Sequence, residues 1–178
     1  VCSSDLVVGA GHAGLEAALA GARMGARVLV VTADLGTVAS MPCNPSVGGP
    51  AKGHLVREID ALGGAMGSIA DRTALQVRML NTGKGAAVQA IRAQVDKAAY
   101  ASAAAEVLRS HPNVTRRAAM VTGLVTEAMR GASRGSGPDH VAVGVTTAAG
   151  DRFAARAVVL TSGTFLEGGL VRGEVVEA

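Results

Sequence analysis

Aromatic residues are scarce in this chain of 178 residues, which contains Tyr100, Phe153, Phe165 and no tryptophan. Its hydrophobic share of 49% therefore comes mainly from small and aliphatic side chains. Small apolar residues let helices lie close to a sheet, so this composition favours parallel strands covered by alanine-rich helices. Charged residues make up 17%, and this balance excludes a disordered chain. The length suits one domain with a hydrophobic core.

Long hydrophobic runs, secretory signals and cysteine pairs are also lacking. No uncharged apolar stretch reaches the roughly 18 residues of a membrane-spanning helix, which excludes such a helix. No charged segment is followed by the apolar region of a secretory signal, so we expect a cytoplasmic protein. The two cysteines, Cys2 and Cys43, form no C-x-x-C pair, and the four histidines lack the spacing of metal ligands. Neither a disulfide framework nor a metal site is therefore expected.

The sequence also lacks long runs of residues with the same charge. The formal net charge at pH 7 is +3, and no long basic run occurs. This balance permits an anionic partner such as a nucleotide or an RNA without demanding one. Basic residues interleaved with aromatic ones, which stack single-stranded bases, are not found, so the sequence does not predict where an RNA would dock.

The first third of the chain predicts a βαβ unit. Leu6–Val8 is a short apolar run, and Arg27–Thr32 is a strand by its β-branched residues. Between them, Leu15–Met24 carries apolar residues at spacings of three and four, which is typical of a helix. Gly25 follows, and glycine is a usual residue just beyond a helix. Together these segments have the size of a βαβ unit.

A glycine-rich turn joins the first predicted strand to the helix. Its sequence, Gly9-x-Gly11-x-x-Gly14, stands where a dinucleotide-binding fingerprint must stand. The first glycine makes the turn, the second lets a pyrophosphate approach, and the third lets the helix pack on the strand. A chance glycine turn is the alternative, because the chain has 24 glycines. The second strand ends in Thr32 rather than an acid and Asp34 follows, so the residue that meets the ribose stays open.

The middle of the chain predicts a long loop and two further helices. Ala33–Gly53 contains prolines and paired glycines, and a loop of this length inside a domain is usually functional or disordered. We then expect a helix at Lys52–Leu62, a possible strand at Leu75–Leu80 and a long helix at Ala87–Ser110 with an apolar stripe.

In the last third of the chain the hydrophobic pattern becomes that of β-strands. We expect strands at Val114–Arg117, Met120–Met129, His140–Thr147 and Arg152–Thr161, with Arg130–Asp139 as a surface loop. This order suggests a small antiparallel meander followed by a strand that returns to the parallel sheet. The predicted fold class is therefore α/β, with a Rossmann-like parallel sheet, covering helices and a small antiparallel β-meander.

Four ordered sequence blocks are far more specific than the glycine motif. They are Gly9–Gly14, Cys43–Gly64, Leu80–Asp96 and Ala157–Gly168. In these blocks the chain resembles the family of bacterial tRNA uridine 5-carboxymethylaminomethyl modification enzymes (MnmG, also called GidA). The second block, for example, carries Cys-Asn-Pro, paired glycines, Lys-Gly-His-Leu-Val and Asp-Ala-Leu-Gly-Gly in the family's order. The resemblance covers nearly the whole chain, except residues 1–5 and a longer loop at Arg130–His140.

The resemblance implies an FAD-binding domain of the glutathione-reductase class over residues 1–178. Members of the family use FAD, NADH and methylene-tetrahydrofolate to add a carboxymethylaminomethyl group at C5 of the wobble uridine of certain tRNAs. They act as homodimers with a partner GTPase, MnmE. We therefore expect an FAD-dependent tRNA-modifying enzyme with these co-substrates and partners. The start at Val1 rather than Met also suggests an N-terminal fragment of a longer protein whose C-terminal part is missing, and such a fragment is expected to be inactive alone.

The resemblance also implies which residues contact the cofactor. The residues expected to hold the FAD pyrophosphate are Gly9, Ala10, Gly11, His12, Ala13 and Gly14. The backbone of Val121, at the start of the meander, is expected to meet the adenine. Thr161 and Gly163, in the turn after the returning strand, are expected to approach the dinucleotide again.

Cys43 is the candidate catalytic residue, and Lys52 is a second candidate. A thiolate can add to C6 of a uracil or move a proton at a flavin, provided that nearby cations or a helix N-terminus favour it. Lys52 and His54 open the helix that follows, and Lys84 lies in a second glycine-rich break. The alternative is a structural thiol that holds the turn of the loop.

Other interpretations remain open from the sequence. Arg92, Gln94 and Lys97 are expected either to contact the flavin or a partner, or to form a solvated helix face. A different FAD enzyme of the same fold, such as the folate-dependent tRNA uridine methyltransferase or a flavin oxidoreductase, is an alternative function, because a fold alone does not determine chemistry. Those enzymes lack the Cys43–Gly64 block. A nucleotide-binding module without catalysis is the other alternative.

Overall fold

A sheet of parallel strands forms the centre of the protein. The computed structural model describes residues 4–128, 140–163, 170–172 and 175–177. The strand order in this sheet is β10-β1-β2-β6. These strands span Val158–Leu160 (β10), Asp5–Val8 (β1), Val28–Thr32 (β2) and Val114–Ala118 (β6). All of their pairings are parallel, which confirms the predicted sheet.

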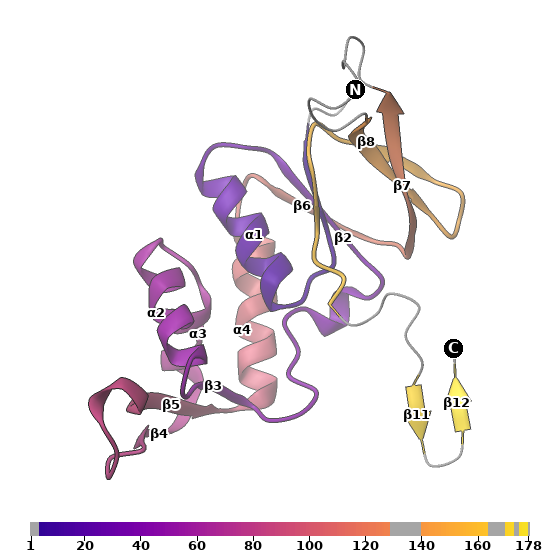
Figure 1. Ribbon diagram of the computed structural model, residues 1–178. Coiled ribbons are helices and arrows are strands. Elements are labelled where there is room, and N and C mark those ends of the chain that lie inside the picture. The colour runs from indigo at the N-terminus through magenta and orange to yellow at the C-terminus, as the bar shows by residue number, and fades with distance from the viewer. Residues whose placement is uncertain (1–3, 129–139, 164–169, 173–174, 178) are drawn as a thin grey trace.

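Helices cover one face of this sheet, and an antiparallel meander covers the other face (Figure 1). The helices are α1 (His12–Arg23) and α4 (Lys97–Ser110). The meander has the strand order β7-β8-β9. Its strands span Val121–Ala128 (β7), His140–Thr147 (β8) and Arg152–Ala154 (β9). The expected α/β fold with a Rossmann-like sheet and a small meander is therefore confirmed.

Alternating side chains of the central strands build two hydrophobic cores. Val7 and Val30 belong to the core under the helices, whereas Leu6 and Val31 belong to the core under the meander, together with Val145. Successive residues of a strand point to opposite faces, so a strand covered on both sides must be apolar throughout. This requirement explains the unbroken apolar runs of β1 and β2.

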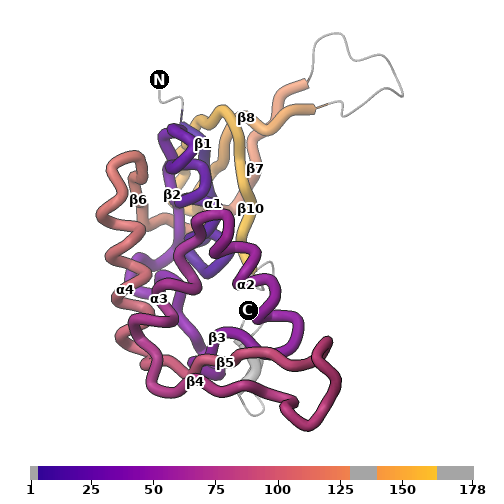
Figure 2. Tube along the Cα trace, turned by 90° about the vertical axis from the view of Figure 1, so that its left-hand side faces the viewer, coloured from indigo at the N-terminus to yellow at the C-terminus, as the bar shows by residue number. Residues whose placement is uncertain are grey.

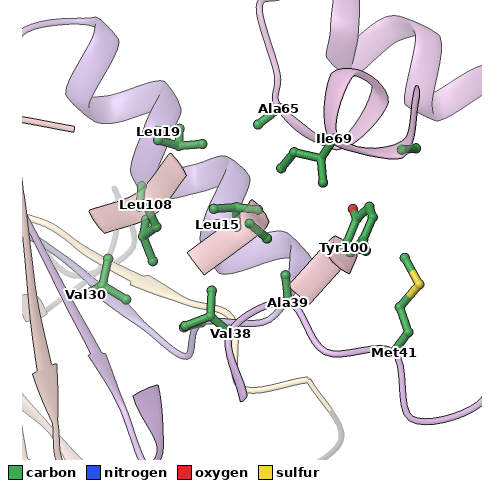
Figure 3. Packing of buried hydrophobic residues seen from close by; sticks show 14 of the residues in the cluster. Leu15, Leu19, Val30, Val38, Ala39, Met41, Ala65, Ile69, Tyr100 and Leu108 are labelled. Atoms are coloured by element: carbon green, nitrogen blue, oxygen red, sulfur yellow. The ribbon is translucent and has the colours of Figure 1, made fainter. Parts of the chain in front are cut away.

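The larger core lies between α1, α4 and the sheet. Leu15 and Leu19 of α1 meet Leu108 of α4 there, and Ile69 joins them (Figure 3). All four side chains are buried. The spacing of four residues between the two leucines places both on one face of α1. The small alanines of α1 on the same face let the helix approach the sheet closely, as the composition predicts.

A second, smaller sheet lies beyond the helices, away from the meander (Figure 2). It is antiparallel, with the order β3-β5-β4. Its strands span Ser46–Gly48 (β3), Ala90–Val95 (β5) and Ala74–Leu80 (β4). Two helices accompany it, α2 (Lys52–Ala61) and α3 (Met66–Thr73). The predictions of a helix from Lys52 and a strand ending at Leu80 are confirmed, whereas α3 was not predicted.

Short elements complete the described residues. These are two 3₁₀ turns, at Leu35–Thr37 and Ala86–Val88, and an antiparallel hairpin of β11 (Leu170–Arg172) and β12 (Val175–Glu177). Among the helices of the described residues, none combines the length and the apolar character needed to cross a membrane.

The prediction of one long helix over Ala87–Ser110 is wrong. Its first half is β5, the central strand of the smaller sheet, and only its second half is helix α4. The apolar residues of Ala90–Val95 fit a helical stripe and a buried strand equally well, and pairing with β3 and β4 decides for the strand. Asp96 marks the boundary, because its side chain accepts a hydrogen bond of 2.8 Å from the Ala99 N–H and caps α4.

Two other boundary predictions need correction. The expected single strand Arg152–Thr161 is divided into β9, which pairs with β8 in the meander, and β10, which pairs with β1 in the parallel sheet. The expected loop Ala33–Gly53 contains the 3₁₀ turn and β3. The predicted loop Arg130–Asp139 lies outside the described residues. In each correction, pairing with a distant strand determines the local structure, and the local pattern does not reveal such pairing.

Glu16 of α1 connects the two parts of the molecule. Its carboxylate accepts hydrogen bonds from the Ala65 N–H, at 2.9 Å, and the Met66 N–H, at 2.7 Å, at the start of α3. A carboxylate is favourable at a helix N-terminus because it satisfies free amides and complements the helix dipole. The buried side chain of Tyr100 lies near this group. Burial, with a further contribution from the charge of Glu16, raises the pKa of Tyr100 to about 12.

We predict that Tyr100 titrates far above an ordinary tyrosine. Its ordinary pKa is 10.0, so the folded chain holds the phenol proton more tightly than the unfolded chain does. This contribution to stability is complete below pH 10 and is lost as the pH rises through the folded value. Tyr100 is the only tyrosine and tryptophan is absent, so absorbance at the tyrosinate band reports this residue alone. The midpoint should lie near pH 12 in the folded 178-residue chain and near 10 in urea. A midpoint near 10 while circular dichroism still shows a folded chain would contradict the burial of Tyr100.

Candidate functional site

The carboxyl ends of the parallel strands gather most of the predicted cofactor residues. Gly9 follows β1, Asp34 follows β2, and Thr161 follows β10. Val121 comes shortly after β6 and starts the meander. In open α/β sheets ligands bind outside the carboxyl ends of the strands. The structure thus brings these four residues, which are far apart in sequence, to the same edge of the sheet.

Gly9 and Gly14 are required by close packing against Thr161. The Thr161 N–H and its Oγ1 both donate to the Val8 carbonyl oxygen, at 2.9 and 2.7 Å. A Cβ atom at Gly9 would lie 2.5 Å from the Thr161 carbonyl oxygen, and Gly9 also has a φ of +94°. A Cβ atom at Gly14 would collide with the Gly9 carbonyl oxygen. The first and third glycines of the motif therefore hold the turn, the helix and the returning strand together.

Gly11 differs from its neighbours because the space above it is open. Among the described residues, no atom other than those of its chain neighbours and of the helix backbone lies within 4 Å of the position that a Cβ atom would occupy there. Gly11 is also the N-cap of α1, and as a glycine it gives the helix no side-chain cap, so the N-cap residue leaves the first amides of the helix unsatisfied. Free amides and the positive end of the helix dipole form an anion-binding site. The turn thus has the shape and the electrostatics of a phosphate cradle.

His12 joins this cradle to a neighbouring cavity. It is the first residue of α1 and it lines the cavity. Its Nε2 atom is buried and has no hydrogen-bond partner among the described residues. The ring lies 5.7 Å from that of Tyr100, measured between centroids. Burial lowers the pKa of His12, against the opposing effect of the nearby Glu16 charge, so the neutral imidazole is favoured.

The cavity has a volume of about 410 Å³ and contains both candidate catalytic residues. Cys43 is exposed to it from the loop before β3, and Lys52 faces it from the start of α2. The side chains of the walls come from that loop, from α2 and from the start of α3. The lining residues are His12, Ser40, Met41, Pro42, Cys43, Asn44, Ser46, Val47, Gly48, Lys52, Leu55, Val56, Ile59 and Met66.

Two backbone contacts fix the loop that carries Cys43. At one end, the Ala39 N–H donates to the Ala10 carbonyl oxygen at 2.8 Å, which ties the loop to the glycine cradle. At the other end, the Gly49 N–H donates to the Ile91 carbonyl oxygen at 2.8 Å. Gly48 has a φ of +101°, and a Cβ atom there would collide with the same carbonyl group. The paired glycines of the sequence block therefore anchor the loop to β5.

Some predicted residues have other roles or lie apart from the cavity. Asp34 is exposed, and its carboxylate accepts a hydrogen bond of 2.7 Å from the Gly36 N–H. His54 and Lys84 are exposed and do not line the cavity. Gly163 follows Thr161 with a φ of +65°. Within the part of the chain that the structure describes, no three His, Cys, Asp or Glu side chains gather as a metal site would require.

Sequence reasoning missed the apolar wall of the cavity. Leu55, Val56 and Ile59 have the spacing of an ordinary buried helix face, yet no residue of α2 is buried. The apolar face of this helix lines the cavity instead. The glycines on both sides of α2 could have indicated this arrangement, because they predict a helix with a tight turn at each end. The hydrogen bonds from Glu16 to the start of α3 were not predicted either, because they join residues 49 and 50 positions apart.

Comparison with known proteins identifies the family. The family model of glucose inhibited division protein A matches residues 5–178, which is nearly the whole chain. The chain belongs to this family. The resemblance found in the four sequence blocks is thereby confirmed.

Members of the GidA family with high similarity carry one functional name. The tRNA uridine 5-carboxymethylaminomethyl modification enzyme MnmG of Lactiplantibacillus plantarum is 54% identical over 171 residues. The MnmG of Chloroflexus aurantiacus is 53% identical over 171 residues. Each alignment covers 96% of this chain and 25% of the relative. The chain thus spans about a quarter of the length of the curated relatives it matches.

Solved structures agree with this assignment. The GidA of Aquifex aeolicus superimposes with a TM-score of 0.84 and 42% identity, covering 98% of this chain and 27% of that one. The FAD-dependent monooxygenase PqsL of Pseudomonas aeruginosa, described as probable, superimposes with a TM-score of 0.58 and 18% identity, over 91% of this chain and 43% of that one. The second likeness shows a shared fold alone.

We predict opposite effects for two glycines of the cradle. Gly11→Val should leave the free energy of unfolding within about 0.5 kcal/mol, because its side chain enters open space. It should nevertheless abolish dinucleotide binding, because it fills the path of the phosphates. Gly14→Ala should lower the free energy of unfolding by about 1–3 kcal/mol, because its Cβ meets backbone that cannot move aside. Urea unfolding of both variants measures the difference. Equal losses in the free energy of unfolding would show that the space above Gly11 is filled in the folded protein.

Proposed function

We propose that this chain is the FAD-binding, N-terminal part of a longer enzyme that adds a carboxymethylaminomethyl group at C5 of the wobble uridine of tRNA. The observation that carries the proposal is the junction at His12 between the glycine cradle and the cavity that contains Cys43. A cofactor held by its phosphates at the cradle can place its other end in that cavity. The names of relatives that are more than half identical to the chain support the same function.

The residues at the cradle fit FAD. The open space above Gly11 admits a pyrophosphate, and the free amides at the start of α1 would donate to it. Either Asp34 or Thr32, at the end of β2, is positioned for the ribose, and the Val121 backbone and Gly163 are at hand for the rest of the dinucleotide. When bound, FAD would exchange electrons with NADH at the cavity in which the one-carbon unit of methylene-tetrahydrofolate is transferred.

The side chains of the cavity would act on the uracil. We assign Cys43 as the nucleophile: its Sγ bonds to C6 of the base, and the electron pair of the C5–C6 bond moves towards C5, which then attacks the methylene carbon of the one-carbon unit. Loss of the C5 proton and cleavage of the bond between that carbon and tetrahydrofolate leave a methylene group double-bonded to C5. An amine that carries a carboxymethyl group then adds to this methylene, and departure of Sγ restores the C5–C6 double bond. Lys52 lines the same cavity and supplies a positive charge there, and the apolar wall of α2 excludes water.

The remaining components of the reaction lie beyond this chain. We propose that the longer protein takes tRNA as substrate, dimerises, works with the GTPase MnmE and is located in the cytoplasm. The chain contributes the FAD-binding part, and the relatives, four times its length, have room for the other binding sites.

The test of this function uses the full-length protein. It should purify yellow and release FAD on denaturation, identified by its mass. It should also restore the modified wobble uridine in tRNA of a strain that lacks the enzyme, as measured by nucleoside mass analysis. Release of FMN or NAD alone, or tRNA without the modified nucleoside, would contradict the proposal.

Replacement of Cys43 tests its chemical role. Cys43→Ser keeps the size of the side chain but removes most of its nucleophilicity. In the full-length enzyme we predict unchanged FAD content and a loss of wobble-uridine modification of more than about tenfold, since removal of a reacting group costs at least this much. Cys2→Ser is the matched control and should modify tRNA normally. If Cys43→Ser retains activity and only the free energy of unfolding falls, by about 1 kcal/mol, the thiol is structural.

A further inference from the structure

One face of the smaller sheet carries two arginines and two glutamines in register. Arg78 of β4 pairs with Arg92 of β5, and Gln76 pairs with Gln94. Residues directly opposite each other on antiparallel strands point to the same face, and their Cβ atoms are about 5 Å apart. These four side chains, with Leu80, line a hollow of about 160 Å³. The hollow is thus a polar site built from hydrogen-bond donors.

Among the described residues, no acidic side chain neutralises the positive charge of this hollow. Arg92 donates a hydrogen bond of 3.0 Å to the Ser46 Oγ, which carries no charge. Neither arginine has an acidic partner among the residues that the structure describes. Like charges directly opposite on paired strands destabilise a sheet. Two facing guanidinium groups therefore cost stability unless an anion lies between them.

The hollow adjoins the cavity that contains Cys43. Ser46, which accepts the hydrogen bond from Arg92, also lines that cavity and lies three residues after Cys43 on the same loop. The hollow and the cavity are therefore linked by one side-chain contact. By contrast, the glycine cradle lies at the carboxyl edge of the parallel sheet, which is a different sheet. The arginine pair is thus separate from the site expected to hold the FAD phosphates.

We propose that Arg78 and Arg92 bind a backbone phosphate of the RNA substrate and so orient its uridine towards Cys43. This inference rests on the proposed function. Guanidinium groups bind phosphate oxygens through paired hydrogen bonds, and the amides of Gln76 and Gln94 can donate further ones. Each nucleotide of an RNA carries its phosphate a few ångströms from its base, so a base in the cavity brings a phosphate to a neighbouring site. The phosphate of a free dinucleotide has the same chemistry, and the experiment separates the two sources.

The experiment compares variants of the full-length enzyme. Arg78→Gln/Arg92→Gln should lower the affinity for an unmodified tRNA transcript at least tenfold, measured by fluorescence anisotropy. Its affinity should also depend less on salt, with a slope smaller by about one for each phosphate that the variant no longer binds. FAD content should equal that of the wild type. Arg109→Gln/Arg117→Gln removes the same charge from α4 and β6, where both residues are exposed, and should bind tRNA as the wild type does.

A lysine variant separates binding from a structural role. Arg78→Lys/Arg92→Lys keeps the charge and should recover much of the salt-dependent affinity for tRNA. The melting temperature of the glutamine variant should equal or exceed that of the wild type, because the facing charges are gone. A lower melting temperature together with unchanged tRNA binding would make the arginines structural and overturn the proposal.

Three further outcomes are distinguishable. If the glutamine variant binds tRNA like the wild type but has a raised KM for NADH or a reduced FAD content, the site holds a dinucleotide phosphate and the RNA assignment is wrong. If the wild-type enzyme modifies tRNA, and Arg78→Gln/Arg92→Gln binds tRNA as well as the control Arg109→Gln/Arg117→Gln does, this inference fails while the proposed function stands. If the wild type itself neither binds nor modifies tRNA, the proposed function fails as well.

Discussion

The close contact between the β1–α1 turn and Thr161 is the constraint on which the rest of the site depends. Gly9 and Gly14 have no side chains, and only for this reason can β10, which lies some 150 residues later in the chain, close over the turn. The contact joins a local motif to β10, the strand of this sheet that comes last in the sequence. This contact holds the start of α1 at the carboxyl edge of the sheet. Backbone amides at the start of a helix in this position favour an anionic ligand.

A second constraint couples this edge to the smaller sheet. The Glu16 carboxylate of α1 accepts hydrogen bonds from the start of α3. The loop after Ala39 runs from the cradle to β5. The cavity with Cys43 lies between these two connections. A cofactor cradle on one sheet and a charged hollow on another therefore adjoin the same cavity.

The sequence predicted most of the fold but not the second sheet. Patterns that depend on neighbours, such as the strands of the βαβ unit and the glycine turn, were correct because local sterics determine them. The error at Ala87–Ser110 has the opposite origin, since β5 exists only through pairing with strands far away in sequence. For the site, the structure places Cys43, Lys52 and His12 in the walls of one cavity, and their roles stay predictions. Arg78 was not chosen, because its significance lies in facing Arg92 across two strands, and that pairing was hidden by the predicted helix.

The most direct test of the central claim is a structure of the full-length protein with FAD bound. We predict that the FAD phosphates lie within hydrogen-bonding distance of the amides at the start of α1, above Gly11. We further predict that the flavin ring enters the cavity lined by Cys43. Phosphates bound at any other edge of the sheet, or a flavin ring on a face remote from Cys43, would contradict the claim that cradle and cavity form one site.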